Sequence, residues 1–247
     1  MRILEKIRAK QNNMYGNDSV TVAFIGDSIT QGCFECFFDS KGGIETVYDY
    51  KSAYSTRFRE IMKMLYPNVQ VNVINSGISG DGALGCLRRL ERDVLRFSPD
   101  LVIFSSGLND AVMGGEEKLE AYGGALKAFF EKCKSAGAEC IMLTECMLND
   151  TVSPHLIGNA RMIEYAERFM KVQNTGILDK YFDKAREIAK AADVPVCDQY
   201  SLWKKMNEVG VNTTELLANK LNHPTREWHY YIAIKLIETI LKFDEKN

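Results

Sequence analysis

Short apolar runs alternate with helix-like segments along this chain, and that alternation limits the folds available to it. The runs are rich in branched residues, and turn or cap residues follow most of them, so each is predicted to be a β-strand. These strands cover residues 20–26, 69–75, 101–107, 138–144 and 194–198. Between them, apolar residues three and four positions apart predict helices over 51–67, 82–97, 117–137 and 177–193.

This order predicts a three-layer α/β/α fold. Parallel strands need right-handed crossovers, which place helices on both faces of the sheet. Two segments, 31–50 and 145–169, interrupt the pattern after the first and fourth strands. They belong to the carboxyl-end side of the sheet, where such proteins bind ligands, and are candidates to wall a pocket. The chain contains no repeat or flexible linker, so residues 1–247 are predicted to form a single domain.

The composition argues against several classes of partner. With 31 basic and 33 acidic side chains, the chain offers no electrostatic case for nucleic acid or an anionic membrane. Residues 1–13 mix apolar and charged side chains, which predicts a short amphipathic helix and not a signal peptide. The seven scattered cysteines are typical of reduced thiols. We therefore expect a cytoplasmic protein with no membrane partner.

Polar turns follow the predicted strands. Because the carboxyl ends of parallel strands share one edge of the sheet, we expect these turns to meet. They are Gly26-Asp27-Ser28 after the first strand, Asn75-Ser76-Gly77 after the second, Gly107-Leu108-Asn109-Asp110 after the third, and 221-LNHPTREWH-229 beyond the fifth.

Together these turns can supply the parts of a nucleophilic site. Ser28 is the candidate nucleophile, and its own N–H, at a helix start, is one oxyanion donor. Gly77 has no side chain to block a second backbone N–H donor, and the Asn109 amide offers a third donor. His223 is the candidate base. Taken singly, Ser28 is typical of a helix N-cap and the others of turn residues. Their joint arrangement favours catalysis, with Asp27 a structural residue of the turn.

This set of positions resembles the SGNH hydrolases, also called the GDSL esterase/lipase family. The family carries a serine in Gly-Asp-Ser, a glycine, an asparagine in Gly-x-Asn-Asp and a histidine in Asp-x-x-His. Ser28, Gly77, Asn109 and His223 match these blocks in the same order. The resemblance implies a flavodoxin-like sheet of strand order 2-1-3-4-5 and ester hydrolysis through an acyl-enzyme. It also implies an oxyanion hole formed by Ser28 N–H, Gly77 N–H and the Asn109 side chain.

One position departs from the family pattern. The family usually has an aspartate three residues before the histidine, and here that position is Lys220. An orienting partner fixes the histidine tautomer, so its loss can lower the rate by orders of magnitude. Asp198, at the end of the fifth predicted strand, is one replacement, although an aspartate there is more often a helix N-cap. A backbone carbonyl, which would leave a Ser-His dyad, is the other.

We therefore expect a serine esterase with Ser28 and His223 as its catalytic residues, and no cofactor or metal ion. By analogy within the family, the expected small-molecule substrate is a short acyl ester, such as acetyl, on a sugar. The alternatives are a lipase or acyltransferase of the same family, or a carbohydrate-binding protein whose catalysis has decayed, as Lys220 permits. A flavodoxin-like nucleotide binder is a further alternative, but it leaves Asn109 and His223 unused. His229, in the last helix, is expected to pack or to cap, and His155 to face solvent.

Overall fold

The sheet of this protein is parallel throughout. The structure, a computed structural model, describes residues 1–39 and 41–244. Its five main strands have the spatial order β4-β1-β5-β6-β7, which is 2-1-3-4-5 when they are counted along the chain. The predicted flavodoxin-like order is therefore confirmed. The strands are β1 (Val20–Gly26), β4 (Val71–Gly77), β5 (Leu101–Ser105), β6 (Glu139–Thr144) and β7 (Val196–Asp198).

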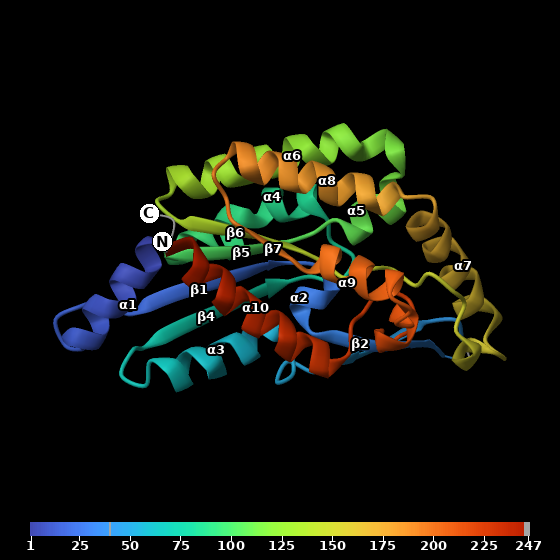
Figure 1. Cartoon of the computed structure of the whole chain (residues 1–247), viewed down its shortest axis with the longest axis horizontal. Helices are drawn as coiled ribbons and strands as arrows, with labels where there is room; N and C mark the ends of the chain where they lie inside the picture. The colour runs from blue at the N-terminus through green and yellow to red at the C-terminus, as the bar shows by residue number, and fades with distance from the viewer. Residues whose placement is uncertain (40, 245–247) are drawn as a thin grey trace.

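Helices cover both faces of this sheet, as predicted (Figure 1). On one face α6 packs between α4 and α8, and on the other α3 packs against α10 and α1 lies beside α10. The helices of the first face are α4 (Ala83–Asp93), α6 (Leu119–Ser135) and α8 (Ile177–Ala191), and those of the second are α1 (Arg2–Asn12), α3 (Tyr54–Leu65) and α10 (Arg226–Asp244).

The core forms where the apolar faces of the helices pack against the buried strands of the sheet. Helix α3 buries Tyr54, Phe58, Ile61 and Met62, which share one helical face. The rings of Tyr54 and Phe58 lie 5.6 and 5.4 Å from that of Phe24 in β1. Every residue of β5 is buried, as a central parallel strand requires. The end of β1 is thus held by close packing against α3.

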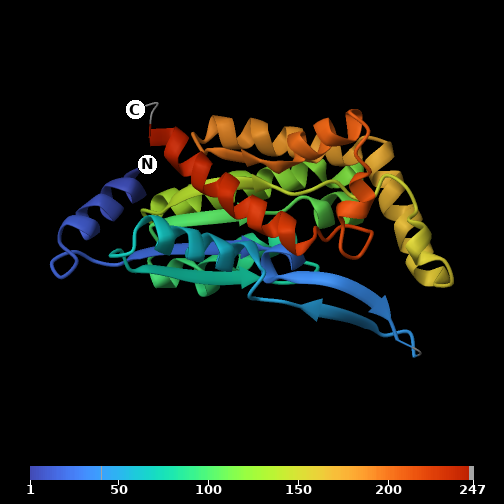
Figure 2. The ribbon, with the colours of Figure 1, turned by 60° about the horizontal axis from the view of Figure 1, so that its bottom comes forward.

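The two interrupting segments form structures that the sequence patterns did not specify. The first is an antiparallel hairpin of β2 (Cys33–Phe38) and β3 (Ile44–Tyr48), which projects past the carboxyl ends of the main strands (Figure 2). The second contains η3 (Pro154–Leu156) and α7 (Ala160–Asn174), at the same end of the molecule. The remaining short elements are α2 (Ser28–Gln31), η1 (Leu95–Phe97), α5 (Leu108–Gly114), η2 (Glu116–Lys118), α9 (Gln199–Glu208) and η4 (Thr213–Leu216).

No helix within residues 1–39 and 41–244 has both the length and the apolar character needed to span a bilayer.

Candidate active site

Ser28 is the first residue of helix α2, and Asp27 alone separates it from Gly26, the last residue of β1. Asp27, and not Ser28, is the helix cap, because its Oδ1 accepts the Ile29 N–H at 2.9 Å. The helix ends after one turn at Gly32, whose φ of 95° favours glycine. Ser28 N–H therefore belongs to the first turn of α2, where amide hydrogens have no acceptor within the helix.

His223 contacts Ser28 directly. The His223 Nε2 atom lies 2.9 Å from Ser28 Oγ, and Nδ1 lies 2.8 Å from the carbonyl oxygen of Phe34 in β2. A carbonyl oxygen only accepts, so Nδ1 carries the hydrogen and Nε2 is free to accept the serine proton. Burial lowers the pKa of His223 to about 4, which keeps the ring neutral at neutral pH. This is the tautomer and charge state that a general base needs.

The loop that carries His223 is organised by Asn219. Its side-chain Oδ1 accepts the N–H groups of Leu221, Asn222 and His223 at 3.0, 2.9 and 2.9 Å. The Lys220 side chain points elsewhere, since its Nζ lies 3.0 Å from the Glu215 carbonyl oxygen and 2.9 Å from the Glu215 carboxylate. The sequence reasoning did not identify Asn219 or Phe34 as contributors. An asparagine in a loop has many possible partners, and a carbonyl oxygen has no residue signature.

Asp198 does not orient His223, which corrects one of the two sequence-based alternatives. Its carboxylate accepts hydrogen bonds from Thr144 at 2.9 Å, from Arg186 at 2.9 and 3.0 Å, and from Ser201, and it caps helix α9. Burial opposes ionisation, but the Arg186 guanidinium prevails and lowers the pKa of Asp198 to about 2. The backbone carbonyl of Phe34 occupies the position that the sequence left open.

Gly77 lies beside the nucleophile turn. It pairs in register with Gly26, and a Cβ added to Gly77 would come within 2.2 Å of the Gln31 nitrogen. Only glycine allows this approach of β4 to α2. The Gly77 N–H donates to Asn75 Oδ1 at 3.0 Å. An incoming oxyanion must therefore share this donor or displace Asn75 from it.

Asn109 also lies at this turn, and both of its amide hydrogens have acceptors. Its Nδ2 donates to Asp27 Oδ2 at 3.1 Å and to the Asp81 carbonyl oxygen at 2.8 Å. The structure thus brings Ser28, His223, Asn109 and Gly77 together at one edge of the sheet. The role of the three donors in an oxyanion hole stays a prediction.

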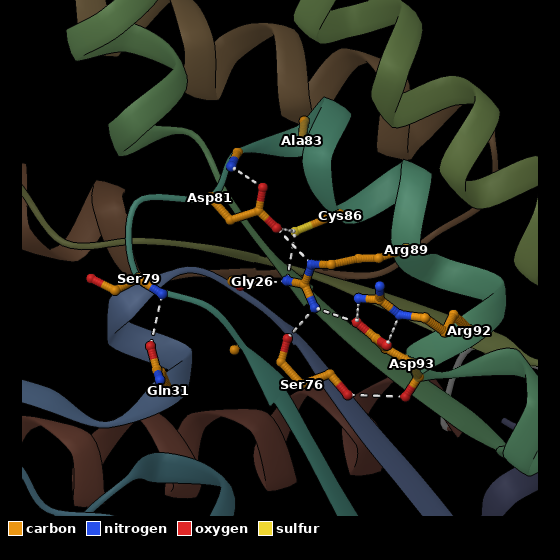
Figure 3. A network of polar contacts seen from close by, with 12 residues as sticks. Gly26, Gln31, Ser76, Ser79, Asp81, Ala83, Cys86, Arg89, Arg92 and Asp93 are labelled. Atoms are coloured by element: carbon orange, nitrogen blue, oxygen red, sulfur yellow. Dashed lines mark hydrogen bonds and ion pairs between the residues drawn. The ribbon is translucent and has the colours of Figure 1, made fainter.

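Arg89 in α4 ties the supporting segments together (Figure 3). Its guanidinium donates to the Gly26 carbonyl oxygen at 2.9 Å, to the Ser76 carbonyl oxygen at 2.6 Å and to Asp81 Oδ2 at 2.6 Å. Gly26 is the last residue of β1, Ser76 precedes the last residue of the neighbouring β4, and Asp81 is the residue whose carbonyl accepts from Asn109. One buried arginine therefore fixes the backbone on which all three predicted donors depend.

The other two histidines lie outside the Ser28–His223 contact, whereas the Cys36 thiol borders it, with its Sγ 3.7 Å from His223 Nδ1. His229 is buried and its Nδ1 accepts the Tyr54 N–H at 3.1 Å, whereas the His155 side chain is 70% exposed. Both expectations for these histidines are confirmed. All seven cysteines are free thiols. A hollow of about 830 Å³ lies at the opposite end of the sheet, and residues such as Met1, Phe130 and Pro195 line it.

The comparisons with known proteins agree with this fold. The profile of the GDSL-like Lipase/Acylhydrolase family matches residues 24–230. An acetylxylan esterase from Geobacillus stearothermophilus is 33% identical over 87 residues, which are 35% of this chain and 38% of that protein. The matched region thus spans well under half of that relative.

Solved structures extend the likeness over most of the chain. An acetyl xylan esterase, AlAXEase, has a TM-score of 0.65 at 19% identity and covers 90% of this chain and 100% of its own. The acetylxylan esterase Axe2 from Geobacillus stearothermophilus has a TM-score of 0.63 at 21% identity, covering 90% of this chain and 94% of its own. At these identities the structures show the shared fold.

The site thus joins a serine and a histidine at the strand ends of an α/β fold. The chain belongs to the GDSL-like lipase/acylhydrolase family, a family of carboxylic ester hydrolases.

Proposed function

We propose that this protein is a serine esterase that removes short acyl groups, acetyl foremost, from carbohydrates through an acyl-enzyme. The observation that carries the proposal is the 2.9 Å contact of Ser28 Oγ with a His223 ring whose Nδ1–H is held by a carbonyl oxygen. A nucleophile activated by an oriented neutral base is the requirement for acyl transfer. The intact contact supports an active enzyme over a carbohydrate-binding protein that has lost catalysis.

The reaction follows from these two residues. His223 Nε2 takes the hydroxyl proton as Ser28 Oγ attacks the ester carbonyl, and the tetrahedral oxyanion forms near the N–H groups of Ser28 and Gly77 and the Asn109 amide. The carbon–oxygen bond to the alcohol then breaks, and His223 returns the proton to that alcohol. A water molecule, deprotonated by His223, attacks the acyl-enzyme. The bond between the acyl carbon and Ser28 Oγ then breaks, the acid leaves, and His223 returns the proton to Ser28 Oγ.

Two observations support a short acyl group on a sugar. Ser28 and His223 are only 3% and 5% exposed, so a small acyl group reaches the nucleophile more readily than a long chain. The named relatives are acetylxylan esterases, which supports a carbohydrate as the alcohol.

Kinetics on p-nitrophenyl acetate and on acetylated xylo-oligosaccharides test the proposal. We expect Ser28→Ala and His223→Ala each to lower kcat by about 10³-fold or more, because nucleophile and base act as a unit. Ser135→Ala and His155→Ala, both on the surface, are the matched controls and should retain wild-type kcat. An activated phosphonate should label Ser28 in the wild-type protein. Unchanged turnover in Ser28→Ala would exclude Ser28 as the nucleophile, and faster turnover of octanoate than of acetate would exclude the short-acyl preference.

A further inference from the structure

Two buried carboxyl groups, those of Asp27 and Glu145, lie at the turn that carries Ser28. Asp27 follows β1 and Glu145 follows β6, and the two residues are 1% and 3% exposed. Nothing in the reaction described above uses Glu145. A buried acid beside a second acid is costly unless a proton or a cation resolves the repulsion.

Asp27 is built to be the ionised member. Its Oδ1 accepts the Ile29 N–H at 2.9 Å, and its Oδ2 accepts the Asn109 amide N–H at 3.1 Å. Hydrogen bonds donated to both oxygens stabilise a carboxylate. Through the second bond, Asp27 also fixes the rotation of the Asn109 amide.

Glu145 is built to be the protonated member. Its Oε2 accepts the Leu108 N–H at 2.9 Å, while its buried Oε1 has no donor anywhere in residues 1–39 and 41–244. The two carboxyl groups accept from adjacent residues, Glu145 from Leu108 N–H and Asp27 from the Asn109 amide, and each affects the pKa of the other, so they are neighbours. Two carboxyl oxygens attract each other only when a proton lies between them, and a proton on Glu145 satisfies the orphan oxygen as well.

We propose that Glu145 is a positioning residue, which stays protonated and donates to the Asp27 carboxylate so that Asp27 holds the Asn109 amide toward the oxyanion. With one amide hydrogen on Asp27, the other hydrogen, now on the Asp81 carbonyl oxygen, is the one that a substrate oxyanion takes. The inference rests on the proposed esterase function of this site. It makes the active enzyme depend on one buried proton that no catalytic step consumes.

The surroundings make the loss of that proton costly. Burial, and then the charge of Asp27, raise the pKa of Glu145 well above its ordinary value, and Asp110 acts in the same direction. Burial also raises the pKa of Asp27 to about 6, with Asp110 and Asp81 adding to it, although hydrogen bonds from Ile29 N–H and Glu145 oppose the rise. The other ionisable groups that interact with this pair are neutral acids with raised pKa values: Tyr54, Tyr122, Cys146, Cys33 and Cys86. The Arg89 guanidinium, which donates to the carbonyl oxygen of Gly26 next to Asp27, is engaged by Asp81.

The pH profile of kcat tests the proposal, because its two limbs then belong to different residues. The acid limb reports the protonation of Asp27 and His223, and the alkaline limb reports Glu145, whose ionisation repels Asp27 and releases Asn109. Glu145→Gln keeps an acceptor for Leu108 N–H and a neutral donor for Asp27. We expect the wild type to show an alkaline limb that this variant lacks. Glu164→Gln, an exposed change on α7, is the matched control and should keep both limbs.

The corresponding amide substitution at Asp27 identifies which of the two carboxyl groups carries the proton. Asp27→Asn places an NH2 group against either Ile29 N–H or the Asn109 amide, so we expect kcat to fall about tenfold or more at every pH, with KM changed far less. Equal effects of Asp27→Asn and Glu145→Gln, or an alkaline limb that survives in Glu145→Gln, would overturn the proposal.

Infrared difference spectroscopy separates this inference from the esterase proposal. Wild type minus Glu145→Gln should show the carbonyl stretch of a buried protonated carboxylic acid at neutral pH. If the band is present in a protein without esterase turnover, the proposed function fails while the shared proton stands. If the band is missing in an active esterase, the positioning role of Glu145 fails.

Discussion

At the scale of single residues, the Nδ1–H of His223 already has an acceptor, the Phe34 carbonyl oxygen at 2.8 Å. Lys220 occupies the place of the family's orienting aspartate, but it has a φ of 59° and its side chain is bound to Glu215. We therefore expect that Lys220→Asp does not raise kcat by more than about twofold, because the new carboxylate would compete for a hydrogen that is taken.

Steady-state kinetics of Lys220→Asp beside Lys220→Ala measure this. The alanine variant removes the same contact with Glu215, so it controls for that loss. A gain of tenfold or more in Lys220→Asp alone would show that the ring rotates to accept an aspartate, and that Phe34 is only a substitute.

Whether the sequence could predict a group of the site depends on whether that group is a side chain in a recognisable motif or a main-chain atom. Ser28, Gly77, Asn109 and His223 lie in short patterns at predicted strand ends, so the sequence could find them and the structure places them together. The partner of Nδ1 is a main-chain oxygen from a hairpin 189 residues away in sequence, and nothing in the residue type of Phe34 indicates that role. Asn219 and Glu145 each accept backbone N–H groups that only the folded chain brings to them, so the sequence does not mark either residue.

At the scale of elements, the β2–β3 hairpin supplies the Phe34 carbonyl, and Arg226 fastens that hairpin to the start of α10. The Arg226 guanidinium lies 4.3 Å from the Phe34 ring centroid and donates to both Glu35 carboxylate oxygens, at 2.6 and 3.0 Å, and to Asp49 at 3.0 Å. Hydrogen bonding to Glu35 is the main cause that raises the pKa of Arg226 above its ordinary value. Since Arg226 is three residues from His223, one side chain sets the distance between the base and its orienting carbonyl.

We expect Arg226→Gln to lower kcat about tenfold while the fold persists, because the planar fork and its stacking on Phe34 are lost. The kcat of Arg226→Lys should lie between those of Arg226→Gln and the wild type. Arg161→Gln is the matched control, because Arg161 holds the far end of the hairpin by donating to the Gly42 carbonyl oxygen at 2.5 Å. Its kcat should stay within about twofold of wild type. Equal losses in the Arg161 and Arg226 variants would mean that general loosening of the hairpin, and not the position of Phe34, sets the rate.

The sequence predicted the regular elements better than this hairpin. The strand pattern of β1 and the helix pattern of α8 follow from the apolar residues, and these two elements begin at the predicted residues, 20 and 177. The hairpin strands are short, and β3 is mostly exposed, so neither carries the burial pattern from which a strand is recognised.

At the scale of the whole molecule, buried ionisable groups of opposite kinds set the response of stability to pH. Burial lowers the pKa of His223 to about 4 and of His229 to about 3, from 6.5. The unfolded chain therefore binds more protons at these histidines below pH 6.5, and stability is lost as the pH falls. Burial raises the pKa of Asp27 and Asp110 from 3.8 to about 6, and it raises that of Glu145 also. For these acids the sign is reversed, and stability is lost as the pH rises.

The two sets oppose each other between about pH 4 and pH 6, so we expect the free energy of unfolding of the wild type to change little across that window. Removing one histidine should expose the contribution of the acids. His229→Gln keeps an acceptor for Tyr54 N–H and lies outside the catalytic contact. Relative to wild type, its free energy of unfolding should rise by about 3 kcal/mol as the pH falls from about 7 to about 4. In the wild type, His229 is protonated below pH 6.5 when unfolded but only near pH 3 when folded, and each pH unit between these values is worth about 1.4 kcal/mol. Urea unfolding at a series of pH values measures both curves. A difference that stays constant with pH would mean that His229 titrates alike in the folded and unfolded chain, and the balance of buried histidines against buried acids would then not hold.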